Sequence, residues 1–253
     1  MRIFIVHAHH EPTSFNAAMT GTAVQALRAA GHEVRVSDLY AMNFDPVSDR
    51  RNFLTVKDPL RLKQQDEEAH ANAHAGFVPE LEAEMAKLAW CEVLVLQFPL
   101  WWLGMPAIMK GWIDRVFALG RTYGGGRYFD KGVFKGKRAM CAVTVGGEAV
   151  AYSDIGIYGP MQAVLHPIQH GILAFVGFSV VEPYVVHAPA RLDAAQRAAV
   201  LDTYAQRLLC VAKAPTLPMV ATGDYAQMVM TSEARLRRGL AISGQSSEGR
   251  SAA

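Results

Sequence analysis

The sequence predicts a doubly wound α/β protein, with a parallel five-stranded sheet covered by helices on both faces. One observation is the alternation of short apolar segments with segments of helical periodicity along the chain. A second is the continuous apolar run Val93–Leu96, which is typical of a strand buried on both faces. A third is the length of each connection, which is enough for a helical crossover between parallel strands.

The first half of the chain carries two strands and one long connection. Thr13 and Ser14 are candidate N-caps for the first helix, and Gly31 is expected to end it. The connection over residues 40–76 is expected to be irregular, because it contains two prolines and a cluster of charged residues. The predicted elements are a strand over residues 2–8, a helix over 15–30 and a strand over 32–39.

The second half continues the alternation. Pro79 and Pro106 each open a helix, and a glycine-rich flap is expected over residues 122–136. Pro167 is expected to interrupt a helix, and Asp193 to cap the last one. The remaining predicted elements are a strand from Val93 to Pro99, a strand over residues 137–145, a strand over 178–187 and a helix over 193–213.

Composition excludes several classes of protein. The 253 residues suit one large domain over residues 1–213 and a C-terminal extension over 214–253 that ends in a flexible tail. The net charge of +2 is too small to indicate nucleic-acid binding, and no apolar run is long enough to span a membrane. The N-terminus does not have the pattern of a signal peptide. Cys91, Cys141 and Cys210 are expected to be buried free thiols, so we expect a cytoplasmic protein.

Three loops follow the first, third and fourth strands, at the carboxyl ends where open α/β sheets bind ligands. The first loop runs from His9 into a helix N-terminus, which suits a phosphate but is also an ordinary cap. The second carries Trp101 and Trp102, which either meet a planar cofactor or cap the core. The third contains Gly146 and Gly147, which allow a close backbone approach. In the strand order 2-1-3-4-5 the three loops are neighbours, an arrangement called flavodoxin-like whose usual ligand is a flavin.

Five stretches carry a resemblance to a known family: AHHEPTSFN, SDLYAMNFDP, QFPLWWLGMPAIMKGWIDRVF, TVGGEAVAYSDIGIYG and HPIQHGILAFVGFSVVEP. In this order they resemble the NAD(P)H:quinone oxidoreductases of the DT-diaphorase type. The resemblance implies hydride transfer from NADPH or NADH, through bound FAD, to a quinone by a ping-pong mechanism. It also implies a homodimer whose active sites lie at the subunit interface.

The resemblance also implies roles for individual residues. Tyr152, Tyr158 and Gly146 match catalytic positions beside the flavin, and Arg197 matches a position on the adenosine side of FAD, which makes FMN the less favoured cofactor. Tyr123, Gly124, Gly125 and Phe175 match the substrate pocket. The remaining matches to cofactor-binding positions are His9, Ser14, Phe15, Asn16, Pro99, Leu100, Trp101, Trp102, Leu103, Thr144, Val145 and Gly147.

The sequence departs from the family pattern at three places. Tyr158 stands where animal members have a histidine, so it is either a neutral donor or a structural residue. The glycines at 124–126 replace a bulkier aromatic stretch, so the pocket is expected to be more open. One animal relative has a metal site of two histidines and a cysteine; His170 matches the first histidine, but Ala174 replaces the second, so no metal is expected.

Other functions stay open at this point. Related flavin reductases act on azo compounds, nitro compounds or metal oxyanions with the same mechanism. Some family members are redox-sensing ancillary subunits of a membrane transporter. A one-electron carrier of the flavodoxin type fits less well, because such carriers are shorter and strongly acidic.

Overall fold

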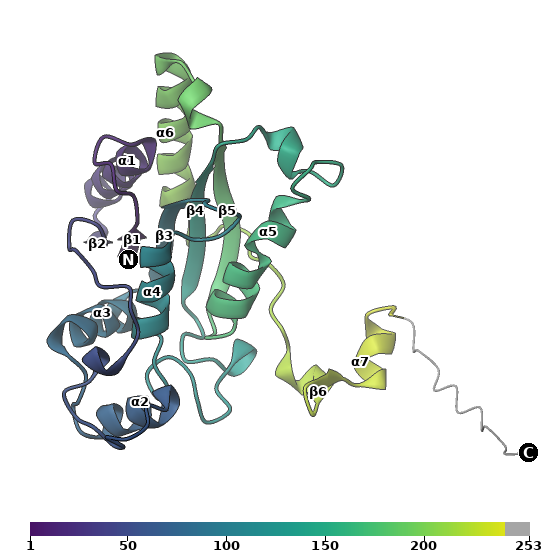
Figure 1. Cartoon of the computed structure of the whole chain (residues 1–253). Coiled ribbons are helices and arrows are strands. Elements are labelled where there is room, and N and C mark those ends of the chain that lie inside the picture. The colour runs from purple at the N-terminus through teal and green to yellow at the C-terminus, as the bar shows by residue number, and fades with distance from the viewer. Residues whose placement is uncertain (241–253) are drawn as a thin grey trace, which may run out of the picture. The chain divides into compact units, whose positions relative to one another are not determined.

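A computed structural model describes residues 1–240 as two units, residues 1–219 and residues 220–240. The larger unit contains a five-stranded parallel sheet of order β2-β1-β3-β4-β5, as the sequence predicts (Figure 1). Its strands are β1 (Arg2–His7), β2 (Glu33–Asp38), β3 (Val93–Pro99), β4 (Arg138–Val145) and β5 (Ser179–His187). The helices are α1 (Phe15–Ala29), α2 (Gln64–Ala73), α3 (Pro79–Trp90), α4 (Ala107–Val116), α5 (Met161–Ile168) and α6 (Ala194–Leu209).

The central strands bury both of their faces, because successive side chains point to opposite sides of a sheet. Ile3 and Ile5 of β1 pack in a cluster with α1 and α6, whereas Phe4 and Val6 belong to a second cluster with α3, α4 and α5. Trp112 of α4 is the largest side chain of the second cluster and meets the ring of Phe4 edge-on. Helices therefore cover both faces of the sheet.

The ends of α1 follow from local chemistry. The Ser14 hydroxyl accepts a hydrogen bond from the Ala17 N–H, which makes Ser14 the N-cap. Gly31 follows the helix with φ of +79°, a conformation that costs glycine little. Thr13 is not a cap, because its hydroxyl donates to the Glu11 carboxylate instead.

Two predicted breaks in helical structure are wrong in part. The connection over residues 40–76 contains α2, which tertiary contacts stabilise: the Glu67 carboxylate accepts the N–H groups of Lys57 and Asp58. Pro167 does not end its helix; α5 continues to Ile168 and passes into a π-helix, Gln169–Ala174. A proline removes one hydrogen bond of the helical ladder, and the wider turns of a π-helix follow it directly.

The glycine-rich segment is only partly a flap. The N–H groups of Phe129 and Phe134 donate to the carbonyls of Phe175 and Val176. Gly132 packs on Gly177 so closely that a Cβ there would lie 2.4 Å from the Gly177 Cα. The second half of the segment is therefore held by backbone contacts, and Gly124–Gly126 remain in an open turn.

The cysteines differ in exposure. Cys91 and Cys141 are buried, and burial raises the pKa of the Cys91 thiol to about 11 and that of Cys141 to about 12. Cys210 is exposed because it caps the C-terminus of α6 on the solvent side, so the expectation that it is buried is wrong.

The smaller unit, residues 220–240, contains a two-stranded hairpin, β6 (Tyr225–Ala226) with β7 (Val229–Met230), and the short helix α7 (Ser232–Arg237). Asp224 receives hydrogen bonds from Arg237 and Arg238. The predicted flexible tail lies outside the described residues. Across residues 1–240, no helix is both long enough and apolar enough to cross a membrane.

Candidate functional site

Three loops meet at the carboxyl edge of the sheet, as the strand order requires. We call this the carboxyl edge: the ends of β1, β3 and β4 and the segments that follow them. The Leu100 N–H donates to the Thr144 carbonyl (2.8 Å), which joins the second loop to β4. The Trp101 ring lies 6.1 Å from the ring of His9 and 5.5 Å from that of His10, centroid to centroid. The first and second loops are therefore in contact.

The second loop is a tight reverse turn. Trp101 and Gly104 exchange both backbone hydrogen bonds, each 3.0 Å long. The two central residues, Trp102 and Leu103, have φ of +52° and +56°, as a type I′ turn demands. Positive φ is unfavourable for large side chains, and the Trp102 side chain at this turn is fully exposed to solvent. Trp102 therefore does not cap the core of its own chain.

A cavity of about 250 Å³ lies at the carboxyl edge. His9 and Asn16 reach it from the first loop and the start of α1, and Thr144 reaches it from the end of β4. Arg197 reaches it from the first turns of α6 and places a guanidinium at the cavity wall. The complete lining is His9, Phe15, Asn16, Thr144, Pro189, Ala190 and Arg197.

A buried hydrogen-bonded network holds two of these side chains. The Tyr204 hydroxyl donates to Gln97 Oε1 (2.9 Å), and Gln97 Nε2 donates to Asn16 Oδ1 (2.8 Å). The Asn16 amide then donates to the Thr144 hydroxyl (2.7 Å). All four side chains are buried, and burial raises the pKa of the Tyr204 hydroxyl well above its ordinary value. The network links α6, β3, α1 and β4, so it fixes the amide and hydroxyl that face the cavity.

The first loop presents donors and a neutral imidazole. His9 Nδ1 accepts the Glu11 N–H (3.0 Å), and the ring stacks on His10. Burial, followed by the neighbouring His10, lowers the pKa of His9. Near neutral pH the His9 ring is therefore uncharged, and its Nε2–H is a hydrogen-bond donor for a ligand at the α1 N-terminus.

The third loop brings two tyrosines together. The rings of Tyr152 and Tyr158 lie 5.1 Å apart between centroids, and His187 at the end of β5 lies 5.9 Å from Tyr152. A Cβ at Gly147 would come within 3.1 Å of the Tyr152 ring, whereas one at Gly146 would meet no atom within 4 Å. Gly147 therefore seats Tyr152, and Gly146 faces open space. Burial raises the pKa of Tyr152, so it is a neutral donor at physiological pH.

The predicted substrate residues lie elsewhere in the chain. Tyr123 and Phe175 line a second cavity of about 250 Å³ together with residues of α2, α4 and the π-helix. Their rings are 6.1 Å apart, and the Tyr128 ring stacks on Phe175. Gly124 and Gly125, with φ of +114° and +62°, turn the chain beside Tyr123.

Glu68 of α2 is the buried carboxyl group of this second cavity. One carboxylate oxygen accepts the Leu119 N–H (2.6 Å), and the other accepts the Gln64 amide (2.8 Å). Burial raises the pKa of Glu68, because the charged form loses its hydration. The carboxyl anchors the chain immediately before Tyr123.

The second cavity lies at the opposite end of the sheet, which we call the amino edge. Tyr123 precedes β4, and Phe175 precedes β5, so both lie where these parallel strands begin. At about 3.3 Å per residue, the eight residues of β4 separate the two edges by about 25 Å. Within one chain, the predicted cofactor and substrate residues therefore form two separate groups.

Several residues of these groups are not singled out by the sequence. Gln97 interrupts the apolar run of β3, which is a signal, because a polar residue in a buried strand needs partners. Pro189 and Ala190 follow β5 at the same edge as the three predicted loops. Glu68 could not be found, because its helix was not predicted. Among residues 1–240, no group of three His, Cys, Asp or Glu side chains is placed to hold a metal ion.

These features define a class: doubly wound α/β proteins whose ligand site lies at the carboxyl ends of parallel strands, at the switch between β1 and β3. Residues 1–208 match the family model described as a flavodoxin-like fold. The chain belongs to this flavodoxin-like family and, within it, to the group of the NAD(P)H:quinone oxidoreductases.

Three relatives document this membership. NAD(P)H dehydrogenase [quinone] 1 of Cavia porcellus is 42% identical over 208 residues, which cover 82% of this chain and 76% of that protein. Ribosyldihydronicotinamide dehydrogenase [quinone] of Homo sapiens is 35% identical over 227 residues, covering 89% and 98%. The crystal structure of a putative quinone reductase from Klebsiella pneumoniae superposes with a TM-score of 0.87 at 38% identity, covering 92% and 95%. The family and the fold inferred from the sequence are confirmed.

Proposed function

We propose that the protein is an NAD(P)H-dependent quinone reductase that binds FAD at its carboxyl edge. The observation that carries the proposal is the cavity between the first loop, the end of β4 and the start of α6, with Asn16, Thr144 and Arg197 on its wall. Support also comes from the names of the relatives, which describe NAD(P)H and quinone as their substrates. A bound flavin would supply the hydride chemistry, accepting two electrons from a nicotinamide and passing them to a quinone.

The residues at this edge fit a flavin dinucleotide. Cavities for whole ligands measure about 300–1,000 Å³. The carboxyl-edge cavity is smaller, at about 250 Å³, so it suits the phosphate and ribityl part. His9 and the α1 N-terminus donate hydrogen bonds there, and the Arg197 guanidinium suits the adenosine side. The planar ring would lie along the turn at Trp102, where the open space at Gly146 lets it approach the backbone.

Tyr152 has the catalytic role in this proposal. Its hydroxyl is a neutral donor held at the carboxyl edge by Gly147, and negative charge develops on the flavin when it is reduced. A fixed donor at that position stabilises the developing charge without reorganisation. The Tyr158 ring packs against the ring of Tyr152, and its hydroxyl is a second hydrogen-bond donor at this edge.

The proposal includes a homodimer, because one chain places the two groups about 25 Å apart. A small acceptor cannot touch both edges of one chain, but a two-fold axis can bring the amino edge of one chain to the carboxyl edge of its partner. The active site then combines Tyr152 and Trp102 of one chain with Tyr123 and Phe175 of the other.

Anaerobic stopped-flow mixing tests the activity. Purified protein mixed with NADPH should lose its flavin absorbance rapidly, and a benzoquinone should restore it rapidly. Acid release of the cofactor followed by mass measurement should give FAD. Slow bleaching would reject the enzyme and favour a redox-sensing subunit, and released FMN would reject the role of Arg197.

Heterodimers of two inactive variants test the shared site. Tyr152→Phe damages the carboxyl edge and Tyr123→Ala the amino edge. In a mixed dimer, one site combines the two intact edges, so co-expressed tagged chains should regain about half of the wild-type activity per dimer. If each site belonged to a single chain, the mixed dimer would have no intact site and no activity would return.

A further inference from the structure

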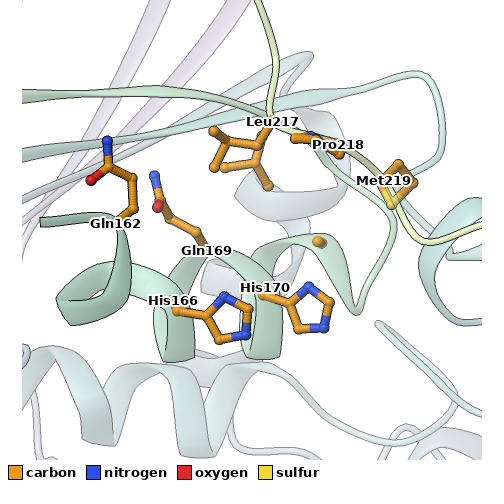
Figure 2. A pocket seen from close by; sticks show the side chains of 9 residues that line it. Gln162, His166, Gln169, His170, Leu217, Pro218 and Met219 are labelled. Carbon is orange, nitrogen blue, oxygen red and sulfur yellow. The ribbon is translucent and has the colours of Figure 1, made fainter. Parts of the chain in front are cut away.

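A third cavity lies outside both groups described above. It measures about 260 Å³ and opens between α5, the π-helix and residues 217–219 (Figure 2). None of its lining residues lines the carboxyl-edge or the amino-edge cavity. Leu217 is held over it because its N–H donates to the Val180 carbonyl (2.7 Å). The proposed quinone reduction gives this cavity no role.

The floor of the cavity carries an unsatisfied donor. Gln169 is only 4% exposed, and its Nε2 has no hydrogen-bond partner within residues 1–240. Figure 2 shows the Gln169 amide reaching from the helix toward Leu217, beside the amide of Gln162. A buried amide without a partner is costly, so folded proteins normally pair it with protein, water or ligand. The partner must be an acceptor.

Two histidines form the next part of the wall. His166 and His170 are four residues apart, and their rings stack at 4.6 Å with an interplanar angle of 13°. Burial, followed by the charge of His166, lowers the pKa of His170. The Phe129 ring, outside the lining, lies 5.1 Å from the His170 ring between centroids. Apart from the two histidines, the side chains that line the cavity carry no ionisable group. Parallel rings direct their nitrogens side by side, which suits two donors better than convergence on one metal ion.

The rest of the lining is apolar. Ala174, Val180, Leu217 and Met219 surround the polar groups. An engineered apolar cavity of about 150 Å³ is enough for a benzene ring. A cavity of about 260 Å³ therefore has room for one ring and a small polar group.

We propose that this cavity binds a small carboxylate with an apolar body, of the size of benzoate. The carboxylate accepts from the Gln169 amide, and the imidazoles of His166 and His170 stand on another part of the same cavity wall. The apolar body packs on Val180, Leu217 and Met219. Burial disfavours the charged form of His170, and an anion beside the two rings favours uptake of one proton by the pair. The site is distinct from the proposed flavin site.

Calorimetric titration of the flavin-loaded protein with benzoate tests the proposal. We expect one benzoate per chain, and an affinity at least tenfold higher at pH 6 than at pH 8. Gln169→Met keeps the side-chain volume and removes the donor, so it should weaken binding at least tenfold. It should not lower the melting temperature of the free protein, because no hydrogen bond is lost. Gln206→Met, an exposed site on α6, is the matched control and should leave binding unchanged.

A second variant keeps the test decisive if Gln169→Met folds poorly. His166 is exposed, so His166→Gln should fold normally, bind benzoate more weakly and lose most of the pH dependence. In NMR spectra, benzoate should shift the ring signals of His166 and His170 and leave those of His187 in place. Unchanged affinity in both variants would overturn the proposal. So would benzoate that competes with the quinone, which places it at the flavin, or tight binding of Zn²⁺ with no effect of benzoate.

Discussion

The two edges of the sheet are built differently. The carboxyl edge is held by a buried side-chain network that crosses four elements, Tyr204 to Gln97 to Asn16 to Thr144. The amino edge is held by one carboxyl group, Glu68, and by backbone contacts between two loops. The first is anchored by side chains of two strands and two helices, whereas the second is anchored by one helical side chain and by backbone contacts between connections. We infer that variants at the carboxyl edge affect cofactor retention and chemistry, and that variants at the amino edge affect acceptor binding without loss of the cofactor.

The largest effect is expected for Gln97→Leu, at the centre of the network. It leaves Asn16 Oδ1 and the Tyr204 hydroxyl buried without partners, at about 1–3 kcal/mol each. Urea denaturation should show a loss of about 3 kcal/mol in the free energy of unfolding, and the flavin content should fall. Gln206→Leu on the exposed face of α6 is the control. A loss below about 1 kcal/mol would show that the network does not stabilise this edge.

Tyr152→Phe is expected to act on the chemistry and not on the fold. Removal of one preorganised donor typically slows a reaction by about 10²–10³-fold, so flavin reduction by NADPH should slow by about 100-fold. The flavin content should stay at the wild-type level, because only the hydroxyl is removed. Tyr158→Phe is the comparison: an equal loss would show that both hydroxyls act. An unchanged reductive rate in Tyr152→Phe would remove Tyr152 from the mechanism.

Glu68→Ala tests the amino edge. The partly buried Leu119 N–H loses its acceptor, so the free energy of unfolding should fall by about 1–3 kcal/mol. The KM for the quinone should rise while the flavin content stays unchanged. Loss of flavin in this variant would contradict the division between the two edges.

Glu68→Gln adds a pH dependence. The pKa of Glu68 is raised in the folded chain, so its contribution to stability is full below its ordinary value of 4.5 and is lost as the pH rises through the folded-state pKa. The wild-type protein should therefore lose stability relative to Glu68→Gln when the pH is raised from 4.5 to neutrality. Thermal melts of both proteins between pH 4.5 and neutrality measure this difference in stability. Parallel curves would show that the carboxyl is not desolvated.

The smallest effect is expected for Trp102→Ala. The exposed ring contributes stacking worth about 0.5–1.5 kcal/mol beyond the buried area, so the flavin dissociation constant should rise by about 2–12-fold. Leu54→Ala, at another exposed apolar side chain, is the control for general surface effects. A flavin dissociation constant equal to that of the wild type in Trp102→Ala would show that the turn does not contact the cofactor.

The sequence predicts the carboxyl edge far better than the amino edge, for a physical reason. Strand order and the positions of loops follow from apolar periodicity, which is local, so residues 9–16, 99–104 and 144–147 converge as expected. α2 has little amphipathic pattern and no side-chain cap, and buried carboxylates stabilise it through distant backbone groups. Such long-range hydrogen bonds leave no periodic trace in a sequence.

The tight turn at Trp102 and Leu103 has a consequence for evolution and engineering. A turn of this kind that only reversed the chain would favour Asn-Gly, because these residues adopt positive φ at little cost. Replacing Trp102 and Leu103 by Asn-Gly should therefore make the flavin-free protein more stable. The same change removes the exposed apolar side chains of the turn. Selection for folding alone would favour other residues at this turn, so the presence of Trp102 and Leu103 in this chain is a cost in folding stability accepted for the surface they expose.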